Sequence, residues 1–307
     1  MDTLTGVRPP SQQAGDGRRW RFPWAAFITA LVALIGLLLF LYPATASWWS
    51  QYHQSRVIRE VSSAVSAEPG GDRQAELARA RAYNDQLVSG AQLKAGANAP
   101  TSEGASSADA EYEGLLRGDA AGAMGRLRVP GIQLDLPIYH GTSDATLEKG
   151  VGHLKGTSLP VGGGSQHSVL TAHRGLASAE LFSNLDRVRV GDRFSIEVFG
   201  EVLSYQVTDT RVVEPEDTET LFPVAGEDLV TLVTCTPLGI NSHRILVTGE
   251  RILPTPQADI DNAGKAPDIP GFPWWAVALG GALVGLGSYV AWAGRPPTPL
   301  AGSAPDV

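Results

Sequence analysis

Two long apolar runs lie near the two ends of the chain. The first covers residues 24–42 (WAAFITALVALIGLLLFLY) and the second covers residues 274–293 (WWAVALGGALVGLGSYVAWA), and neither contains a charged residue. As a helix, each run would be about 30 Å long, which matches the hydrocarbon core of a bilayer. We therefore predict transmembrane helices over residues 24–46 and 274–294. Because Ala44–Ala46 resembles a cleavage site, a signal peptide is the alternative for the first run.

Basic residues set the expected direction of these helices. Arginines at positions 8, 18, 19 and 21 precede the first helix, and Arg295 follows the second. Short basic segments stay on the cytoplasmic side of a membrane, so the tails 1–23 and 295–307 are predicted to be cytoplasmic. The chain then reads as a multi-pass protein of the cell membrane, with the lipid bilayer as a partner and everything between the helices outside.

The region after the first span changes from helical to loop-like patterning. Apolar and polar residues alternate at helical spacing over Ser50–Ser66 and again from Asp72 to Leu87, with a Pro-Gly-Gly break between them. This pattern predicts a helical stalk over residues 47–95. Residues 96–123 begin with a small, polar, low-complexity stretch, which predicts a mobile loop with a lid as the alternative reading.

From Met124 onward the pattern becomes a series of short β runs separated by glycine- and proline-containing turns. The runs are residues 125–141, 167–175, 192–200, 202–213, 228–235 and 243–252. With only one short helix expected, near Ser178–Leu185, their regular spacing favours a closed or nearly closed β-barrel over alternating βαβ units. The fold class is therefore predicted to be mainly β, with the barrel over residues 124–253 and a linker over 254–273.

Composition narrows the classes of function. The chain has 307 residues, 43% of them hydrophobic, and a formal charge of −8. This acidic balance lacks the basic footprint of a protein that binds phosphate backbones, so nucleic acid is excluded as a partner. Its single cysteine permits neither an internal disulfide nor a multi-thiolate metal site, and we expect no metal and no cofactor. The remaining question is what Cys235 does.

Three side chains capable of acyl-transfer chemistry stand at predicted strand ends. Cys235 follows the strand 228–234, Arg244 begins the next strand after a turn, and His173 closes the strand 168–172. A thiolate can attack an amide carbonyl, an imidazolium can protonate the departing amine, and a cation can stabilise the oxyanion. For each residue a purely structural role is the alternative, because a lone cysteine is ordinarily a small buried hydrophobic residue and a histidine or arginine beside a turn is ordinarily at the surface.

Two threonines flank the cysteine. Thr234 and Thr236 are candidates to offer a hydroxyl or a backbone N–H to the oxyanion, with ordinary strand and turn residues as the alternative. Three further imidazoles, His140, His153 and His243, are scattered along the chain and are expected to be hydrogen-bonded structural groups rather than metal ligands.

The short sequence motifs around these residues resemble the signature of the sortase family. Residues 231–235 read TLVTC, Arg244 follows nine residues later, and residues 171–175 read TAHRG. The likeness covers Met124 to Ile252, and the helical region with two spans resembles the class C, pilin-polymerising branch of gram-positive bacteria. Further matching strings are GRLRVPGI (125–132), PIYHGT (137–142), LEKGVGH (147–153) and GTSLPVG (156–162).

The resemblance implies a sortase-type barrel and assigns roles. Cys235 would cleave an LPXTG-type sorting signal between Thr and Gly, His173 would protonate the leaving amine, and Arg244 would hold the acyl oxyanion. A pilin lysine would then resolve the thioester, so the implied partners are sorting-signal-bearing pilins or surface proteins. The family often carries an Asp-Pro-aromatic lid motif, which residues 92–110 lack.

Two alternatives stay open at this point. One is a housekeeping sortase that attaches proteins to a cell-wall peptide. The other is a non-catalytic exterior scaffold or receptor with a buried thiol. The sequence leaves the oligomeric state undetermined.

Overall fold

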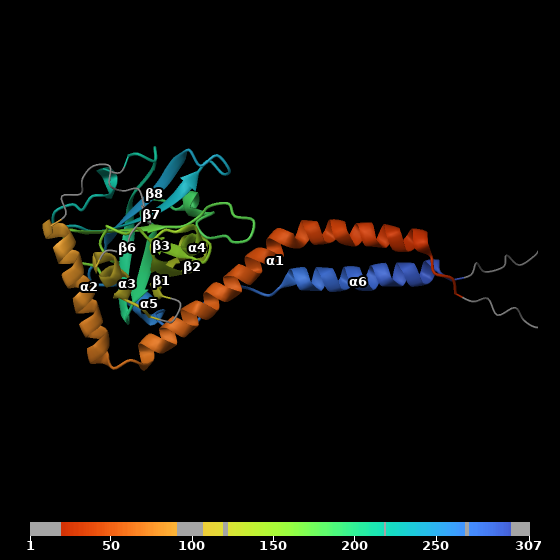
Figure 1. The fold of residues 1–307 in the computed structure, drawn as a ribbon, viewed down its shortest axis with the longest axis horizontal. Coiled ribbons are helices and arrows are strands. Elements are labelled where there is room, and N and C mark those ends of the chain that lie inside the picture. The colour runs from red at the N-terminus through yellow and green to blue at the C-terminus, as the bar shows by residue number, and fades with distance from the viewer. Residues whose placement is uncertain (1–19, 91–106, 119–121, 218, 268–269, 296–307) are drawn as a thin grey trace, which may run out of the picture. The chain divides into compact units, whose positions relative to one another are not determined.

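The computed structural model describes residues 20–90, 107–118, 122–217, 219–267 and 270–295. The chain divides into two compact units, one made of residues 1–42 and 274–307 and the other of residues 43–273. The first unit holds the N-terminal part of helix α1 (Trp24–Ala67) and helix α6 (Trp274–Ala293) (Figure 1). Both helices are long and apolar enough to cross a membrane, and both predicted spans are helical.

Helix α1 differs from the sequence-based expectation in its continuity. The expected transmembrane segment 24–46 and the start of the expected stalk belong to one helix that passes through Pro43 without a break. A proline inside a helix removes one backbone hydrogen bond, but apolar and helix-compatible residues on both sides continue the pattern. The change in composition near residue 47 is therefore not a change of secondary structure.

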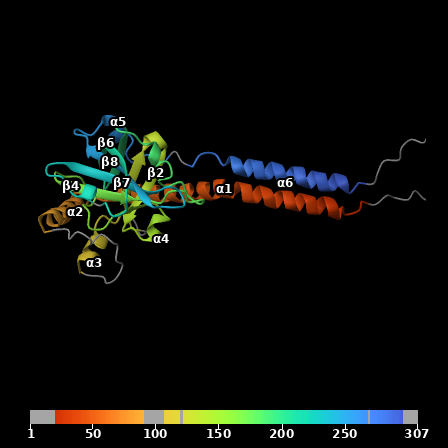
Figure 2. The ribbon, with the colours of Figure 1, turned by 90° about the horizontal axis from the view of Figure 1, so that it is seen from above.

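The helices of the second unit pack onto the barrel and do not form a free stalk. The C-terminal part of α1 buries Val61 and Val65 against Ala123 and Tyr139. Helix α2 (Gly70–Gly90) runs along the outside of the barrel (Figures 1 and 2). It contributes apolar side chains to the main hydrophobic core, namely Leu77 and Ala80.

The loop expected over residues 96–123 is wrong for part of its length. Residues 107–114 form helix α3 (Ser107–Gly114), and Tyr112, Leu115 and Leu116 are buried in the main core. These three large apolar side chains supply the burial that the small, polar stretch before them lacks. Residues 96–106 and 119–121 lie outside the described residues.

The second unit is built on a closed barrel of eight strands in the order β1-β2-β3-β4-β7-β8-β6-β5, which confirms the predicted fold class. Neighbouring strands are antiparallel except for two parallel pairs, β2 with β3 and β4 with β7. The strands are β1 Ala123–Val129, β2 Leu134–His140, β3 Val151–His153, β4 Gln166–Thr171, β5 Arg193–Val198, β6 Glu201–Val213, β7 Asp228–Thr236 and β8 His243–Arg251.

Short helical turns connect the strands, and a last one follows β8. They are η1 (Pro130–Ile132), α4 (Asp144–Leu147), η2 (Leu185–Arg187), η3 (Glu219–Leu221) and α5 (Gln257–Asp261). The helix expected near Ser178–Leu185 is absent from this described segment, which forms turns that lead into η2. Leu181 has a φ of +41°, outside the right-handed helical region, and the Phe182 N–H donates to the His173 carbonyl (3.0 Å). That long-range bond pulls the segment back toward the end of β4.

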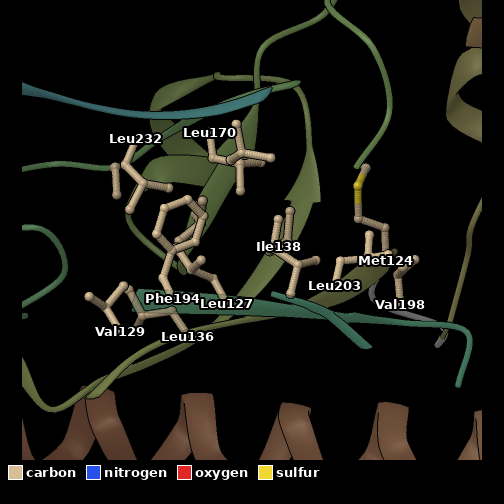
Figure 3. Packing of buried hydrophobic residues seen from close by; sticks show 14 of the residues in the cluster. Met124, Leu127, Val129, Leu136, Ile138, Leu170, Phe194, Val198, Leu203 and Leu232 are labelled. Atoms are coloured by element: carbon tan, nitrogen blue, oxygen red, sulfur yellow. The ribbon is translucent and has the colours of Figure 1, made fainter. Parts of the chain in front are cut away.

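Inward-pointing side chains fill the barrel. Figure 3 shows Leu127, Ile138, Leu170, Phe194 and Leu232 converging from different strands. Burying one such side chain contributes about 1.5–3 kcal/mol, so the interior is the main source of stability for the second unit. A separate outer cluster covers part of the opposite face of β4, β7 and β8, with Val169, Val233 and Leu246 at its centre.

Candidate functional site

The site is built where the strands β4, β7 and β8 meet. The β-branched residues of β7 favour an extended strand, and Pro237 follows its end because proline cannot continue the hydrogen-bonded ladder. Strand β4 runs parallel to β7, with Thr171 beside Val233. Their C-terminal ends therefore lie next to each other, at the same edge of the barrel.

The register places the three candidate residues on one face. In the β7–β8 ladder Cys235 is directly opposite Arg244, so their side chains leave the same side of the sheet. Val233, two residues before Cys235, belongs to the outer cluster, and so does Val169 of β4. Counting in steps of two from Val169 brings His173 to that same outer face, just past the end of β4. The fold thus brings together three residues that the sequence spreads over 72 positions.

The thiol of Cys235 is free and half-buried. The rest of β7 before it is buried from Leu229 to Thr234, so exposure begins at the nucleophile candidate itself. A cysteine at such a position is accessible to a ligand in a way that a core cysteine is not. The interpretation of Cys235 as a buried hydrophobe is therefore wrong.

The imidazole of His173 is also half-buried, and among the described residues it has no hydrogen-bond partner within the protein. The Arg244 guanidinium is held by its own turn, because Nη1 donates to the carbonyls of Asn241 (2.9 Å) and His243 (3.1 Å). Within the part of the chain that the structure describes, the other nitrogens of Arg244 are left for a ligand.

The flanking threonines are used differently from the expectation. The Thr234 hydroxyl, which is buried, donates its proton to the Ala172 carbonyl (2.8 Å), so it cannot also donate to an oxyanion. The role proposed for that hydroxyl is corrected accordingly. The Thr236 hydroxyl accepts from Nη1 of Arg174 (2.9 Å) and keeps its own proton.

The turn after the nucleophile carries apolar residues that sequence reasoning missed. Leu238 is 56% exposed and Ile240 is 72% exposed, next to Cys235 in the chain. Turns are ordinarily polar. The apolar residues in the run Pro-Leu-Gly-Ile (237–240) were therefore the sequence signal for an apolar surface at this turn. Leu238 also packs against Gly175. A Cβ added at position 175 would lie only 2.4 Å from Leu238 Cδ2, and the φ of +74° is one that side chains rarely adopt, so both features favour glycine.

The other imidazoles make structural hydrogen bonds. His153 is fully buried, with Nδ1 2.8 Å from the Tyr112 hydroxyl and Nε2 2.9 Å from the Ser158 carbonyl. Burial lowers its pKa to about 4. His140 lies 3.3 Å from the Gly122 carbonyl, and His243 lies 2.8 Å from the Ser242 hydroxyl. Within the described ranges, no three His, Cys, Asp or Glu side chains are placed to hold a metal ion.

A closed eight-stranded barrel with a half-exposed cysteine opposite an arginine can support acyl transfer, because a thiolate is a nucleophile and a guanidinium stabilises an oxyanion. A Sortase domain model matches residues 127–252. Sortase C1 from Streptococcus agalactiae has a TM-score of 0.59 and 40% identity, over 65% of this chain and all of that one. Sortase C-1 from Actinomyces oris has a TM-score of 0.53 and 45% identity, over 59% of this chain and 98% of that one.

A curated relative gives the same result from sequence. Sortase D of Bacillus subtilis (strain 168) is 28% identical over 146 residues, which are 47% of this chain and 71% of that protein. The chain belongs to the sortase family and is a sortase-type cysteine transpeptidase. The resemblance read from TLVTC and TAHRG is confirmed, and the non-catalytic scaffold is set aside.

Proposed function

We propose that this sortase is a membrane-anchored enzyme that joins pilin subunits through an isopeptide bond. The sortase C structures that it resembles are matched over 59–65% of the chain, which is more than the residues 127–252 of the domain match alone. Two apolar helices fit a membrane-anchored enzyme. The flanking arginines support an extracytoplasmic catalytic domain with both termini in the cytoplasm.

In the first half-reaction the Cys235 thiolate attacks the carbonyl carbon of Thr in an LPXTG-type signal. The Arg244 guanidinium, opposite Cys235 in the ladder, stabilises the resulting oxyanion. The bond from that carbon to the Gly nitrogen then breaks, while the His173 imidazolium gives its proton to the departing amine. The products are a thioester on Cys235, a neutral imidazole and a free glycine amine.

In the second half-reaction a lysine amine of the next pilin attacks the thioester. His173 accepts the proton from the amine, the C–S bond breaks, and the thiolate is restored. Water competes with the amine, so transfer requires the incoming lysine to be held next to the thioester. The exposed Leu238 and Ile240 supply an apolar surface for substrate beside the nucleophile.

The observations that support this proposal are the register of β7 and β8, which pairs Cys235 with Arg244, and the parallel pairing of β4 with β7, which brings the end of the strand before His173 next to the end of β7. A test uses the full chain in detergent micelles with an LPXTG-containing peptide. Mass spectrometry should detect a peptide acyl group on Cys235, and lysine-bearing pilin should remove it. Retention of full cleavage by Cys235→Ala would show that the nucleophile is wrongly assigned.

The acceptor amine separates pilus assembly from wall anchoring. Pilin lysine and a wall-precursor peptide amine are supplied together at equal concentration, and the two products are quantified. We expect the pilin isopeptide to dominate. Dominance of the wall-peptide product would instead assign a housekeeping role, with the chemistry at Cys235 unchanged.

A further inference from the structure

The residues on either side of the candidate catalytic pair are bonded to one another. Ala172 and Arg174 flank His173, whereas Thr234 and Thr236 flank Cys235. The Thr234 hydroxyl donates to the Ala172 carbonyl (2.8 Å), and Arg174 Nη1 donates to the Thr236 hydroxyl (2.9 Å). The backbone N–H of Ala172 also donates to the Val233 carbonyl (3.2 Å). These bonds join the end of β4 to the end of β7 on both sides of the site.

Arg174 is the anchor of the outer bond. Its side chain is only 10% exposed, and each of its three nitrogens has a partner. Nε donates to the Ser183 carbonyl (3.3 Å), Nη1 to Thr236, and Nη2 pairs with the Asp186 carboxylate (2.9 Å). A planar guanidinium held at three points has little freedom, so it fixes the position of the Thr236 hydroxyl.

These side chains lie on the face opposite to the reacting groups. Side chains alternate along a strand, so Thr234 and Thr236 point away from the face that carries Cys235. Thr234 is 1% exposed, and Ala172 belongs to the main core. Among the described residues, no hydrogen bond joins these side chains to the side chains of Cys235, His173 or Arg244, so any effect on the reaction must pass through the strand ends.

We propose that Arg174, with Thr234 and Thr236, forms a clamp that holds His173 and Cys235 at reacting distance. This proposal rests on the assignment of His173 and Cys235 as the catalytic pair. The clamp residues are positioning residues. Because a displacement of about 1 Å can cost about 100-fold in rate, loosening the clamp lowers the rate of chemistry more than it weakens substrate binding.

The test measures kcat and KM for LPXTG-peptide cleavage by the full chain, with folding followed by thermal unfolding. We expect Arg174→Gln to lower kcat by about 10- to 100-fold with KM within about twofold. Arg174→Lys should also lose activity, since an ammonium cannot make the same three bonds. Arg187→Gln, which removes an exposed arginine beside Asp186, serves as the matched control and should match the wild type.

A pair of substitutions at Thr234 tests the inner bond. Thr234→Ser keeps the hydroxyl and should retain kcat, whereas Thr234→Val removes the donor and should lower it. This contrast also keeps the proposal testable if the Arg174 variants fail to fold. Equal kcat values for the serine and valine variants would contradict a clamp through Thr234.

A double-mutant cycle tests the outer bond. If Arg174 acts through Thr236, then Arg174→Gln combined with Thr236→Val should be no slower than the slower single variant. If the reductions in kcat of the two single variants multiply in the double variant, the clamp is overturned and Thr236 has an independent role. A rise in KM at constant kcat in Arg174→Gln would overturn it too, because Arg174 would then contribute to binding.

Failure of the clamp is distinguishable from failure of the proposed function. If Cys235→Ala is inactive while Arg174→Gln retains wild-type kcat, only the clamp is wrong. If Cys235→Ala still cleaves the peptide, the catalytic pair itself is wrong.

Discussion

Two histidines stand at the ends of neighbouring strands, and their surroundings are opposite. His153 ends β3 inside the unit, fully buried, between the Tyr112 hydroxyl and the Ser158 carbonyl. His173 follows β4 on the outer face, half-exposed, and within the described residues its ring has no partner. A buried imidazole with both nitrogens bonded fixes structure, whereas an accessible one with free nitrogens can exchange a proton with a substrate.

The same contrast extends to the elements around each ring. Helix α3 brings Tyr112 to His153, and Leu115 and Leu116, which follow the helix, are buried in the main core. Around His173 it is the chain neighbours that are bonded, since Arg174 donates to Thr236 and Ala172 accepts from Thr234. Within the described residues, the His173 ring is therefore unpaired while its chain neighbours are bonded.

The largest expected effect concerns the open region. His173→Gln should reduce turnover of an LPXTG peptide by about 10²- to 10⁴-fold, because it removes the proton donor for the leaving amine. Steady-state kinetics with a fluorogenic peptide measures this loss. The matched substitution His153→Gln should change kcat per folded molecule little, and equal kinetic losses in the two variants would erase the contrast.

The next effect is the pH dependence of stability at the closed region. The folded-state pKa of His153 is about 4, below its ordinary 6.5, because burial disfavours the charged ring. Between these values the unfolded chain binds more protons than the folded one, so stability rises with pH and is lost as pH falls from about 6.5 to about 4. The loss attributable to His153 is on the order of 3 kcal/mol, measured by urea unfolding across this range.

His140 and His167 also have pKa values lowered by burial, so they contribute with the same sign. The contribution of His153 is isolated by comparing the wild type with His153→Gln at each pH. The stability difference between them should shrink as the pH falls. A difference that stays constant from pH 7 to pH 4 would contradict the assignment.

A smaller effect is expected at Tyr112. Tyr112→Phe removes the hydroxyl that bonds His153 Nδ1 and also accepts from the Gly141 N–H (3.1 Å). Leaving buried polar groups unsatisfied should lower the free energy of unfolding by about 1–3 kcal/mol. Tyr83 is half-buried and lies beside the Tyr112 ring. Tyr83→Phe therefore provides the control and should lower the free energy of unfolding by less.

The smallest effect concerns the glycine of the TAHRG string. Gly175→Ala places a Cβ against Leu238 at a φ of +74°, whereas Gly191→Ala meets open space at a φ of +97°. Both variants should lose about 1 kcal/mol of stability from backbone strain. Only Gly175→Ala should also alter peptide cleavage, by a few-fold, since it displaces the turn after Cys235. Equal activities would show that the Gly175–Leu238 contact does not shape the site.

Much of the fold could be read from local patterns. Strand runs in residues 124–253, the apolar helices and the break at 68–71 follow from periodicity and turn residues, which act over a few positions. The loop expected over residues 96–123 was wrong at residues 107–118, because Tyr112, Leu115 and Leu116 gain their burial only from the barrel. The short helix expected near residue 180 does not form, because the Phe182 N–H donates to the His173 carbonyl and not to a carbonyl within a helix.

The sequence by itself determined which residues are the candidates for the chemistry, because the chain has a single cysteine and the motifs TLVTC and TAHRG are distinctive. Only the tertiary structure decided which polar groups are left free. Whether Thr234 donates to an oxyanion or to Ala172 depends on a strand 62 residues away, and so does the partner of Arg174. Hydrogen-bonding capacity belongs to a residue type, but its partner is set by the register of parallel strands that no local pattern encodes.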